Sequence, residues 1–324
     1  MEGAGGELSR LAWGERLCAA SAGAQAIRLS RRTLLRMTAA AATAAASATA
    51  LAAAARSGPL PGGRRIPRDR ISIQLYTLRS QLAADLEGTL AALREIGYAR
   101  VEHAGFAGRT AAQFKAALDA NAIVASSGHV PIPQPFDAAA WSASLADART
   151  LGSSYIVHPS FGRDVATGAV TRTTAPWRDF ARDLNRAGRM ARDAGVKLGY
   201  HNHHWEFFRL LDNPSRTAYD VLADATDPAL VHLELDLFWA ARGARDPVAL
   251  IRRHQGRIQQ FHVKDMNQAG SFADLGAGLI DFPRIFEDAR EAGVAEYIVE
   301  RDDAGSHALA SARAGYEYLA SVRF

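Results

Sequence analysis

Five segments of the chain consist of an apolar run followed by His, Asp, Glu or Lys. They read VEH at 101–103, YHNHHWEF at 200–207, LELDLFW at 233–239, FHVKD at 261–265 and VERDD at 299–303. Imidazoles and carboxylates bind divalent cations and transfer protons, and Asp and Glu are rarely buried without a partner. If these segments meet in the fold, the sequence predicts a metal-dependent enzyme.

The spacing within three of the segments puts polar side chains in pairs. Residues two positions apart in a strand point to the same side of the sheet. The pairs are Glu234 with Asp236, His262 with Lys264, and His201 with His203. Each pair would therefore face one common space at the end of its strand.

The polar segments belong to a regular alternation of short apolar strands and helical patterns. Strands are predicted at 71–77, 99–103, 122–128, 154–160, 196–203, 231–238, 258–264 and 297–301. Alternation with continuously apolar strands indicates a parallel sheet, and eight units predict a single-domain (β/α)8 TIM barrel. No glycine-rich dinucleotide fingerprint follows the first strand, which argues against an open Rossmann sheet. Active sites of such barrels lie at the carboxyl ends of the strands, where the polar residues fall.

The first 55 residues have the pattern of a twin-arginine signal peptide. Ser30-Arg31-Arg32 precedes an Ala-rich stretch at 37–55 that ends in a small-residue cleavage site. An Ala-rich amphipathic or transmembrane helix is the alternative, although Ala and Thr are only weakly apolar. The signal predicts the twin-arginine export machinery as a partner, a periplasmic location and a mature form that is not embedded in the membrane. Residues 56–70, rich in Pro and Gly, are predicted to be a flexible linker, and 71–324 the barrel domain.

Composition excludes several other classes of protein. The single cysteine, Cys18, leaves no basis for a disulfide framework or a Cys-rich zinc site. The formal charge of +4 comes from dispersed arginines without interleaved aromatic residues, so a nucleic-acid partner is not expected.

From about Ile71 onward the chain resembles the sugar phosphate isomerase/epimerase family, also described as xylose-isomerase-like or AP-endonuclease-2-type TIM barrels. The resemblance is carried by Gly97-Tyr98, Val101-Glu102, the YHNHHWEF run, Glu234-Leu235-Asp236, His262-Val263-Lys264-Asp265, Gly276-Ala277-Gly278 with Ile280-Asp281-Phe282, and Ile298-Val299-Glu300. It implies one divalent metal, with Mn²⁺ favoured and Zn²⁺, Co²⁺, Fe²⁺ and Mg²⁺ as the other candidates. It also implies Asp236, His262 and Glu300 as ligands.

The fourth ligand of the implied metal has two candidates. Many family members end strand five with Glu-Asn, whereas this chain has His201-Asn202-His203, followed by Glu206. Either a histidine replaces the ligand or Glu206 reaches back to the metal. We prefer Glu206, because three oxygens and one nitrogen suit Mn²⁺, whereas a His-rich site favours Zn²⁺ or Fe²⁺.

The resemblance implies a small sugar substrate and a reaction that begins by removing a proton next to a carbonyl. The enediolate formed from a keto sugar or oxidised glycoside then leads to an isomerase, epimerase or lyase outcome. Glu206 and Glu300 are the acid/base candidates, and Lys264 would stabilise the developing oxyanion. Six further residues are candidates for substrate contact, with a purely structural role as the alternative: Glu102, His129, His158, His201, His203 and Trp239.

Two other functions stay open from the sequence. One is a non-catalytic exported sugar-binding barrel, suggested by the histidine on strand five. The other is an endonuclease-like phosphodiesterase, which needs three metals and more ligands than the sequence supplies. If the protein is exported, an unphosphorylated substrate such as a 3-keto glycoside or an inositol derivative is expected, and the oligomeric state is left open.

Overall fold

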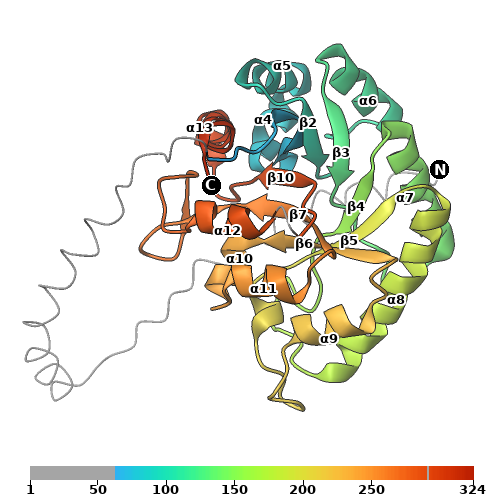
Figure 1. The fold of residues 1–324 in the computed structure, drawn as a ribbon. Helices are drawn as coiled ribbons and strands as arrows, with labels where there is room; N and C mark the ends of the chain where they lie inside the picture. The colour runs from blue at the N-terminus through green and yellow to red at the C-terminus, as the bar shows by residue number, and fades with distance from the viewer. Residues whose placement is uncertain (1–62, 290–291) are drawn as a thin grey trace, which may run out of the picture.

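The core of the fold is a barrel of eight parallel strands. A computed structural model describes residues 63–289 and 292–324. The strands are β1 (Ile71–Gln74), β2 (Arg100–His103), β3 (Val124–Gly128), β4 (Tyr155–His158), β5 (Lys197–His201), β6 (Val231–Asp236), β7 (Ile258–Val263) and β10 (Glu296–Val299). They pair in the order β3-β2-β1-β10-β7-β6-β5-β4 (Figure 1). A parallel bridge between His129 and Val157 joins the two edges, so the predicted (β/α)8 TIM barrel is confirmed.

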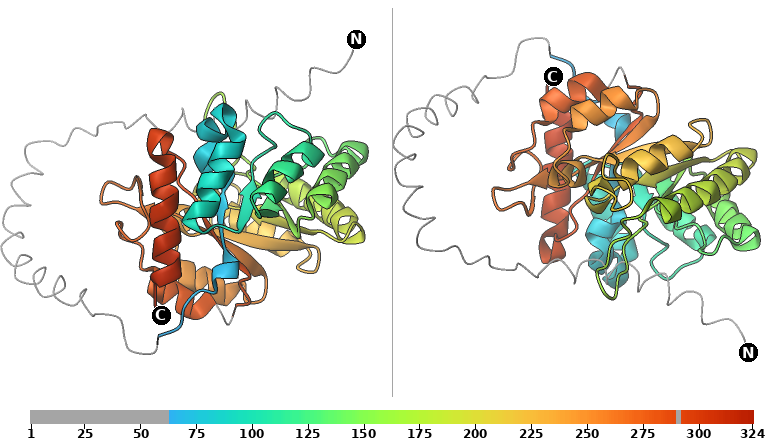
Figure 2. Two further views of the ribbon diagram at one scale, coloured as in Figure 1. Left: turned by 90° about the horizontal axis from the view of Figure 1, so that it is seen from above. Right: turned by 90° about the horizontal axis from the view of Figure 1, so that it is seen from below.

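Helices follow the strands and cover the outside of the barrel (Figure 2). The α-helices are α4 (Arg79–Ala84), α5 (Leu86–Ile96), α6 (Ala111–Ala120), α7 (Ala138–Leu151), α8 (Thr174–Asp193), α9 (Ala218–Ala225), α10 (Leu237–Arg242), α11 (Pro247–Arg253), α12 (Phe282–Ala289) and α13 (Ala308–Ser321). Short 3-10 helices are η1 (Arg68–Arg70), η2 (Leu75–Leu78), η3 (Trp205–Phe207) and η4 (Gly305–His307). An antiparallel hairpin, β8 (Asp265–Met266) with β9 (Phe272–Ala273), extends from the end of β7.

Local sequence signals define the ends of the helices. Helix α5 begins at Asp85, whose side chain accepts a hydrogen bond from the backbone N–H of Gly88 at 2.9 Å. It ends at Gly97, which has a φ of 125° and would place a Cβ 2.5 Å from the ring of Tyr316. Helices α6 and α9 begin with capping boxes at Thr110 and Thr217. These signals define where the three helices begin and where α5 ends.

The apolar core lies between the strands and the helices, whereas the inside of the barrel is polar. At the amino ends of the strands, buried Glu296 accepts hydrogen bonds from Ser126 and from Gln260, the latter at 3.1 Å. The Oε1 of Gln260 lies 2.8 Å from Nε2 of His232. Buried polar groups are stable only when they are paired, so this layer forms a hydrogen-bonded floor beneath the carboxyl-end residues.

The described chain starts within the predicted linker. Ile66 is buried, and the backbone N–H of Arg64 donates to the carbonyl of Phe324 at 2.7 Å. Residues 63–70 therefore pack against the end of the chain. The predicted signal peptide and the rest of the linker lie outside the described residues. Within the described ranges, no helix has the length and apolar character needed to cross a bilayer.

Candidate metal and active centre

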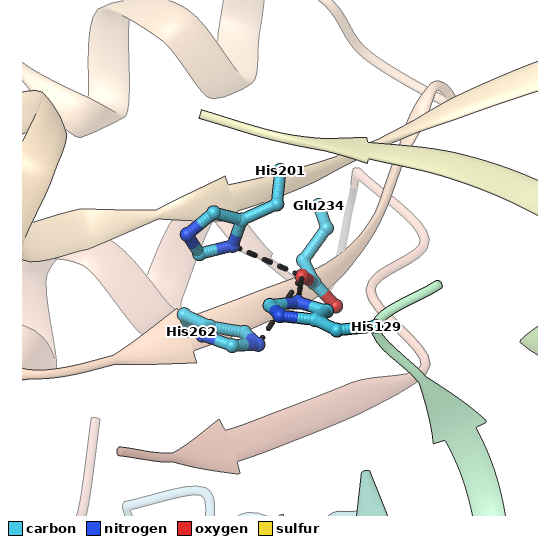
Figure 3. A group of neighbouring side chains, drawn as sticks. All are labelled: His129, His201, Glu234 and His262. Atoms are coloured by element: carbon cyan, nitrogen blue, oxygen red, sulfur yellow. Dashed lines mark hydrogen bonds and ion pairs between the residues drawn. The ribbon is translucent and has the colours of Figure 1, made fainter. Parts of the chain in front are cut away.

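Four side chains from different strand ends converge on one point at the carboxyl end of the barrel. His129 follows β3, His201 ends β5, Glu234 lies in β6 and His262 lies in β7 (Figure 3). One ligand atom from each lies within 4.8 Å of the others. The Oε2 of Glu234 lies 2.8 Å from Nε2 of His129 and 3.0 Å from Nδ1 of His201. We call these four residues the histidine cluster.

The predicted ligands Asp236, His262 and Glu300 form a second, overlapping group. Their ligand atoms also lie within 4.8 Å of one another. The Nδ1 of His262 lies 2.7 Å from Glu300, while its Nε2 faces the histidine cluster 3.2 Å from Glu234. The three residues predicted as ligands are therefore close enough to share an ion, and their role as ligands stays a prediction.

Lys264 already places a positive charge among these carboxylates. Its buried Nζ lies 3.0 Å from Asp236, 2.7 Å from Glu300 and 2.9 Å from Asp302. Although burial lowers the pKa of Lys264, Asp236, Asp302 and Glu300 raise it well above its ordinary value. The ammonium therefore holds the second group together, and a metal ion would have to compete with it.

The histidine cluster fits a divalent cation better. The Oε1 of Glu234 is buried without a hydrogen-bond partner among the described residues. Burial, and then the charge of Glu102, raise the pKa of Glu234 to about 7, as expected for two buried carboxylates without enough positive charge. Burial and the neighbouring His262 and His129 hold the pKa of His201 well below its ordinary value, which keeps its imidazole in the neutral form that binds metals. Burial lowers the pKa values of His129 and His262, but the charges of Glu102 and Glu234 raise them above their ordinary value, so a metal ion would displace protons from these two rings.

The donor set of the histidine cluster differs from the one that the family resemblance implied. Three imidazoles and one carboxylate favour Zn²⁺, Fe²⁺ or Co²⁺ over Mn²⁺. Of the two strand-five candidates, the geometry favours His201, which lies in the cluster.

Glu206 belongs to neither group of potential ligands. Its Oε1 accepts a hydrogen bond from Tyr200 at 2.8 Å, and its Oε2 accepts one from the backbone N–H of His203 at 3.0 Å. The side chain is fully buried, and burial raises its pKa to about 8. At neutral pH Glu206 is therefore mostly protonated, which suits a proton donor better than a metal ligand.

Glu102 lies beneath the histidine cluster and binds two of its members. Its Oε2 is 2.6 Å from Nε2 of His262 and 3.2 Å from Nε2 of His129. Ser127 and Gln74 donate to its two oxygens at 2.6 Å and 2.7 Å. Because both oxygens of Glu102 already have these partners, the geometry favours orienting the histidines over contacting a substrate.

The remaining predicted contact residues occupy different surroundings. His158 accepts a hydrogen bond from the backbone N–H of Ile132 at 3.0 Å and lies 2.8 Å from the carbonyl of Ser160, so both of its nitrogens have backbone partners. The ring of His203 lies 5.1 Å from that of His201 and 5.3 Å from that of Trp239. His203 and Trp239 therefore border the cluster, whereas His158 has a structural environment.

Two residues of the centre were missing from the predicted set. Glu234 was noted only as the same-face neighbour of Asp236, and Asp302 only as part of the VERDD segment. The two-residue spacing was the signal for Glu234.

Gly276 and Gly278, part of the family motif, donate their backbone N–H groups to Asp265 at 3.0 Å and 2.9 Å.

A cavity of about 720 Å³ lies at the opposite end of the barrel. Its lining includes Arg70, Tyr155, Lys197 and Glu296, which stand at the amino ends of the strands. The histidine cluster lies at the carboxyl end, so this cavity is separate from the candidate centre.

A polar centre at the carboxyl end of an eight-stranded parallel barrel defines a TIM-barrel protein with an enzyme-like site. Residues 90–322 match the family described as xylose isomerase-like TIM barrel. The chain belongs to this family.

Curated relatives include an inosose dehydratase from Geobacillus kaustophilus (strain HTA426), 31% identical over 168 residues that cover 45% of this chain and 53% of the relative. The rhizopine catabolism protein MocC from Rhizobium meliloti is 27% identical over 272 residues, covering 73% of this chain and 81% of that protein. The chain thus spans about half the length of the inosose dehydratase that it matches.

Solved structures show the same fold. A sugar phosphate isomerase/epimerase from Parabacteroides distasonis ATCC 8503 is 26% identical, with a TM-score of 0.67 over 79% of this chain and 95% of that one. An L-ribulose 3-epimerase, at 18% identity and a TM-score of 0.57, covers 77% of this chain and 93% of its own and supports the fold alone.

The buried Glu206 predicts a specific pH dependence of stability. Its folded-state pKa of about 8 lies above the ordinary 4.5, so the folded protein holds this proton more tightly than the unfolded chain. The resulting stabilisation is complete below about pH 4.5 and is lost as the pH rises through about 8. Glu206→Gln, which mimics the protonated form, should gain about 1–4 kcal/mol of unfolding free energy relative to the parent between about pH 5 and about pH 9.

Urea unfolding at several pH values measures this difference. Glu317→Gln, at an exposed position on α13, is the matched control and should follow the parent at every pH. If the unfolding free energies of Glu206→Gln and the parent change in parallel with pH, Glu206 is ionised in the folded protein and the prediction is wrong.

Proposed function

We propose that the protein is a divalent-metal-dependent carbohydrate enzyme of the lyase, isomerase or epimerase type that acts on a keto polyol. The convergence of the histidine cluster with Asp236, Glu300 and Lys264 at one buried place is the observation that carries this proposal. The relatives named inosose dehydratase and sugar phosphate isomerase/epimerase support it. The dehydratase relative favours elimination of water from a cyclic keto polyol as the outcome.

His129, His201, Glu234 and His262 would hold the ion, which when bound would act as a Lewis acid on a substrate carbonyl. Glu300 would accept the proton from the carbon next to that carbonyl, because its carboxylate lies beside the cluster and is oriented by Lys264 at 2.7 Å. Lys264 would also donate to the oxygen on which negative charge develops.

Elimination needs a second group that returns a proton. The C–H bond breaks, its electron pair forms the new carbon–carbon double bond, and the C–O bond to the leaving hydroxyl breaks. Glu206, which is protonated at neutral pH, would give its proton to that hydroxyl so that it leaves as water, and His203 is the alternative donor. Isomerase and epimerase outcomes instead return the proton to a carbon atom.

We propose further that the protein is exported by the twin-arginine pathway and acts in the periplasm. Ser30-Arg31-Arg32 and the Ala-rich stretch at 37–55 support this proposal. An exported enzyme would meet unphosphorylated sugars or oxidised glycosides more often than cytoplasmic sugar phosphates.

Replacing both arginines tests the export proposal. The double variant Arg31→Lys, Arg32→Lys should stay in the cytoplasm, because the export machinery reads the arginine pair as an address. Cell fractionation with immunodetection measures the distribution, and Arg28→Lys is the matched control that should be exported like the parent. Equal export of the double variant and the parent would contradict the proposal.

Proton exchange tests the chemistry. In D₂O with an inosose and Zn²⁺, Co²⁺ or Mn²⁺, the parent should exchange or eliminate, as followed by NMR. Glu300→Gln should lower kcat by about 10²–10⁴-fold, since it removes the proton acceptor. Asp303→Asn, at an exposed neighbouring carboxylate, is the matched control and should keep kcat within about twofold.

Other results would point to the other functions. Binding of the inosose without exchange by the parent, with each of the three metals, would identify a sugar-binding barrel. Three metal ions per chain with cleavage of abasic DNA would identify an endonuclease.

A further inference from the structure

Two arginines and a histidine gather at the mouth of the barrel, outside the histidine cluster. Arg163 lies between β4 and α8, His204 follows β5, and Arg242 ends α10, which directly follows β6 (Figure 1). The strands β4, β5 and β6 are neighbours in the sheet, so their carboxyl ends bring these three residues to one side of the mouth. We call these three residues the arginine rim.

Aromatic rings connect the members of the arginine rim. The guanidinium of Arg163 lies 5.4 Å from the ring of Trp205, and that of Arg242 lies 5.8 Å from the ring of Trp239. The ring of His204 lies 5.3 Å from Trp205 and 5.1 Å from Trp239. Both cations therefore stand one aromatic ring away from the same histidine.

The charges of the arginine rim are not neutralised within the described part of the chain. Arg242 donates to the backbone carbonyl of Gly270, and neither guanidinium forms an ion pair with a described carboxylate. Burial, followed by Arg242 and Arg163, lowers the pKa of His204 to about 4, so its ring is neutral at physiological pH. Two full positive charges thus remain available at the rim.

Two buried polar atoms without hydrogen-bond partners lie at the arginine rim. Nδ1 of His204 and Nε1 of Trp239 are buried, and neither has a hydrogen-bond partner among the described residues. Buried polar groups in proteins are nearly always hydrogen-bonded, so these two atoms are available to a bound molecule or an ordered water. Aromatic rings also connect the rim to the histidine cluster. The ring of Trp239 lies 5.3 Å from that of His203, which lies 5.1 Å from that of His201.

We propose that the arginine rim binds an acidic group of the substrate, a carboxylate or a phosphate, while the keto polyol part reaches the histidine cluster. Guanidinium groups bind such anions through charge-assisted hydrogen bonds, often two at a time. This inference rests on the proposed function, because it takes the histidine cluster as the reacting centre. It makes Arg163 and Arg242 the residues that select acidic over neutral carbohydrates.

Binding measurements without turnover test the inference. Isothermal titration calorimetry of the full chain, with a chelator present, compares D-glucuronate, D-glucose 6-phosphate and D-glucose. At least one acidic sugar should bind about tenfold or more tightly than glucose, which corresponds to ~1.4 kcal/mol. The acidic sugar that binds with the higher affinity shows whether the rim prefers a carboxylate or a phosphate.

The double variant Arg163→Gln, Arg242→Gln should reduce that preference to within about twofold, since the charge-assisted hydrogen bonds are lost. The double variant Arg189→Gln, Arg313→Gln, at exposed positions on α8 and α13, makes the same charge change away from the rim and should keep the preference. Thermal unfolding is the control for folding: a midpoint temperature equal to that of the parent shows that the Arg163→Gln, Arg242→Gln variant is folded.

The inference is overturned if the parent binds neither acid, if it binds acids and glucose equally, or if the Arg163→Gln, Arg242→Gln variant keeps the preference. Failure of the proposed function gives a different pattern. Acid-selective binding with no proton exchange, on either a neutral or an acidic keto polyol, would contradict the proposed function and leave the arginine rim intact. Exchange without acid selectivity would do the reverse.

Discussion

The structure depends on balancing several negative charges inside the barrel. Glu102, Glu234 and Asp236 are fully buried and Glu300 is 6% exposed. Removing an ion from water costs several kcal/mol even after relaxation, so buried carboxylates persist only with cations or hydrogen-bond donors around them. Lys264 supplies one fixed positive charge, and the three imidazoles beside Glu234 supply nitrogens that bind either protons or a metal.

The parallel register of the strands places these groups side by side. His201 is in register with Glu234 across β5 and β6, and Asp236 is in register with His262 across β6 and β7. Neighbouring strands thus deliver paired donors at two successive levels of the barrel, one at Glu234 and the next at Asp236. The hydrogen-bonded layer around Glu296 fills the space below, and the apolar contacts that stabilise the fold lie outside the strands, against the helices.

The fold could be predicted because eight short apolar strands alternate with helical patterns along the chain. The convergence of Asp236, His262 and Glu300 could also be predicted, since all three close apolar strands. The height of each side chain along the barrel axis could not be predicted. Two-residue alternation shows which face of the sheet a side chain points to, but not how far along the barrel it lies. Glu234 therefore stood out only as a neighbour of Asp236.

The choice between His201 and Glu206 shows the same limit. The sequence favoured Glu206 on the number of oxygen donors, but the 3-10 turn at Trp205–Phe207 directs this side chain to Tyr200 and the backbone of His203. The path of a short turn depends on tertiary packing and has no periodic signature. The departure from the family pattern at strand five was visible, and the histidine itself turned out to lie in the cluster.

X-ray absorption spectroscopy of the chain loaded with one equivalent of Zn²⁺ distinguishes the histidine cluster from the group of Asp236, His262 and Glu300. Zinc in the histidine cluster should have three imidazole ligands and one carboxylate, and His201→Gln should remove one of the imidazoles. A bound zinc with a single imidazole and otherwise oxygen ligands, unchanged in that variant, would place the ion at Asp236, His262 and Glu300 and contradict the histidine cluster as the metal centre.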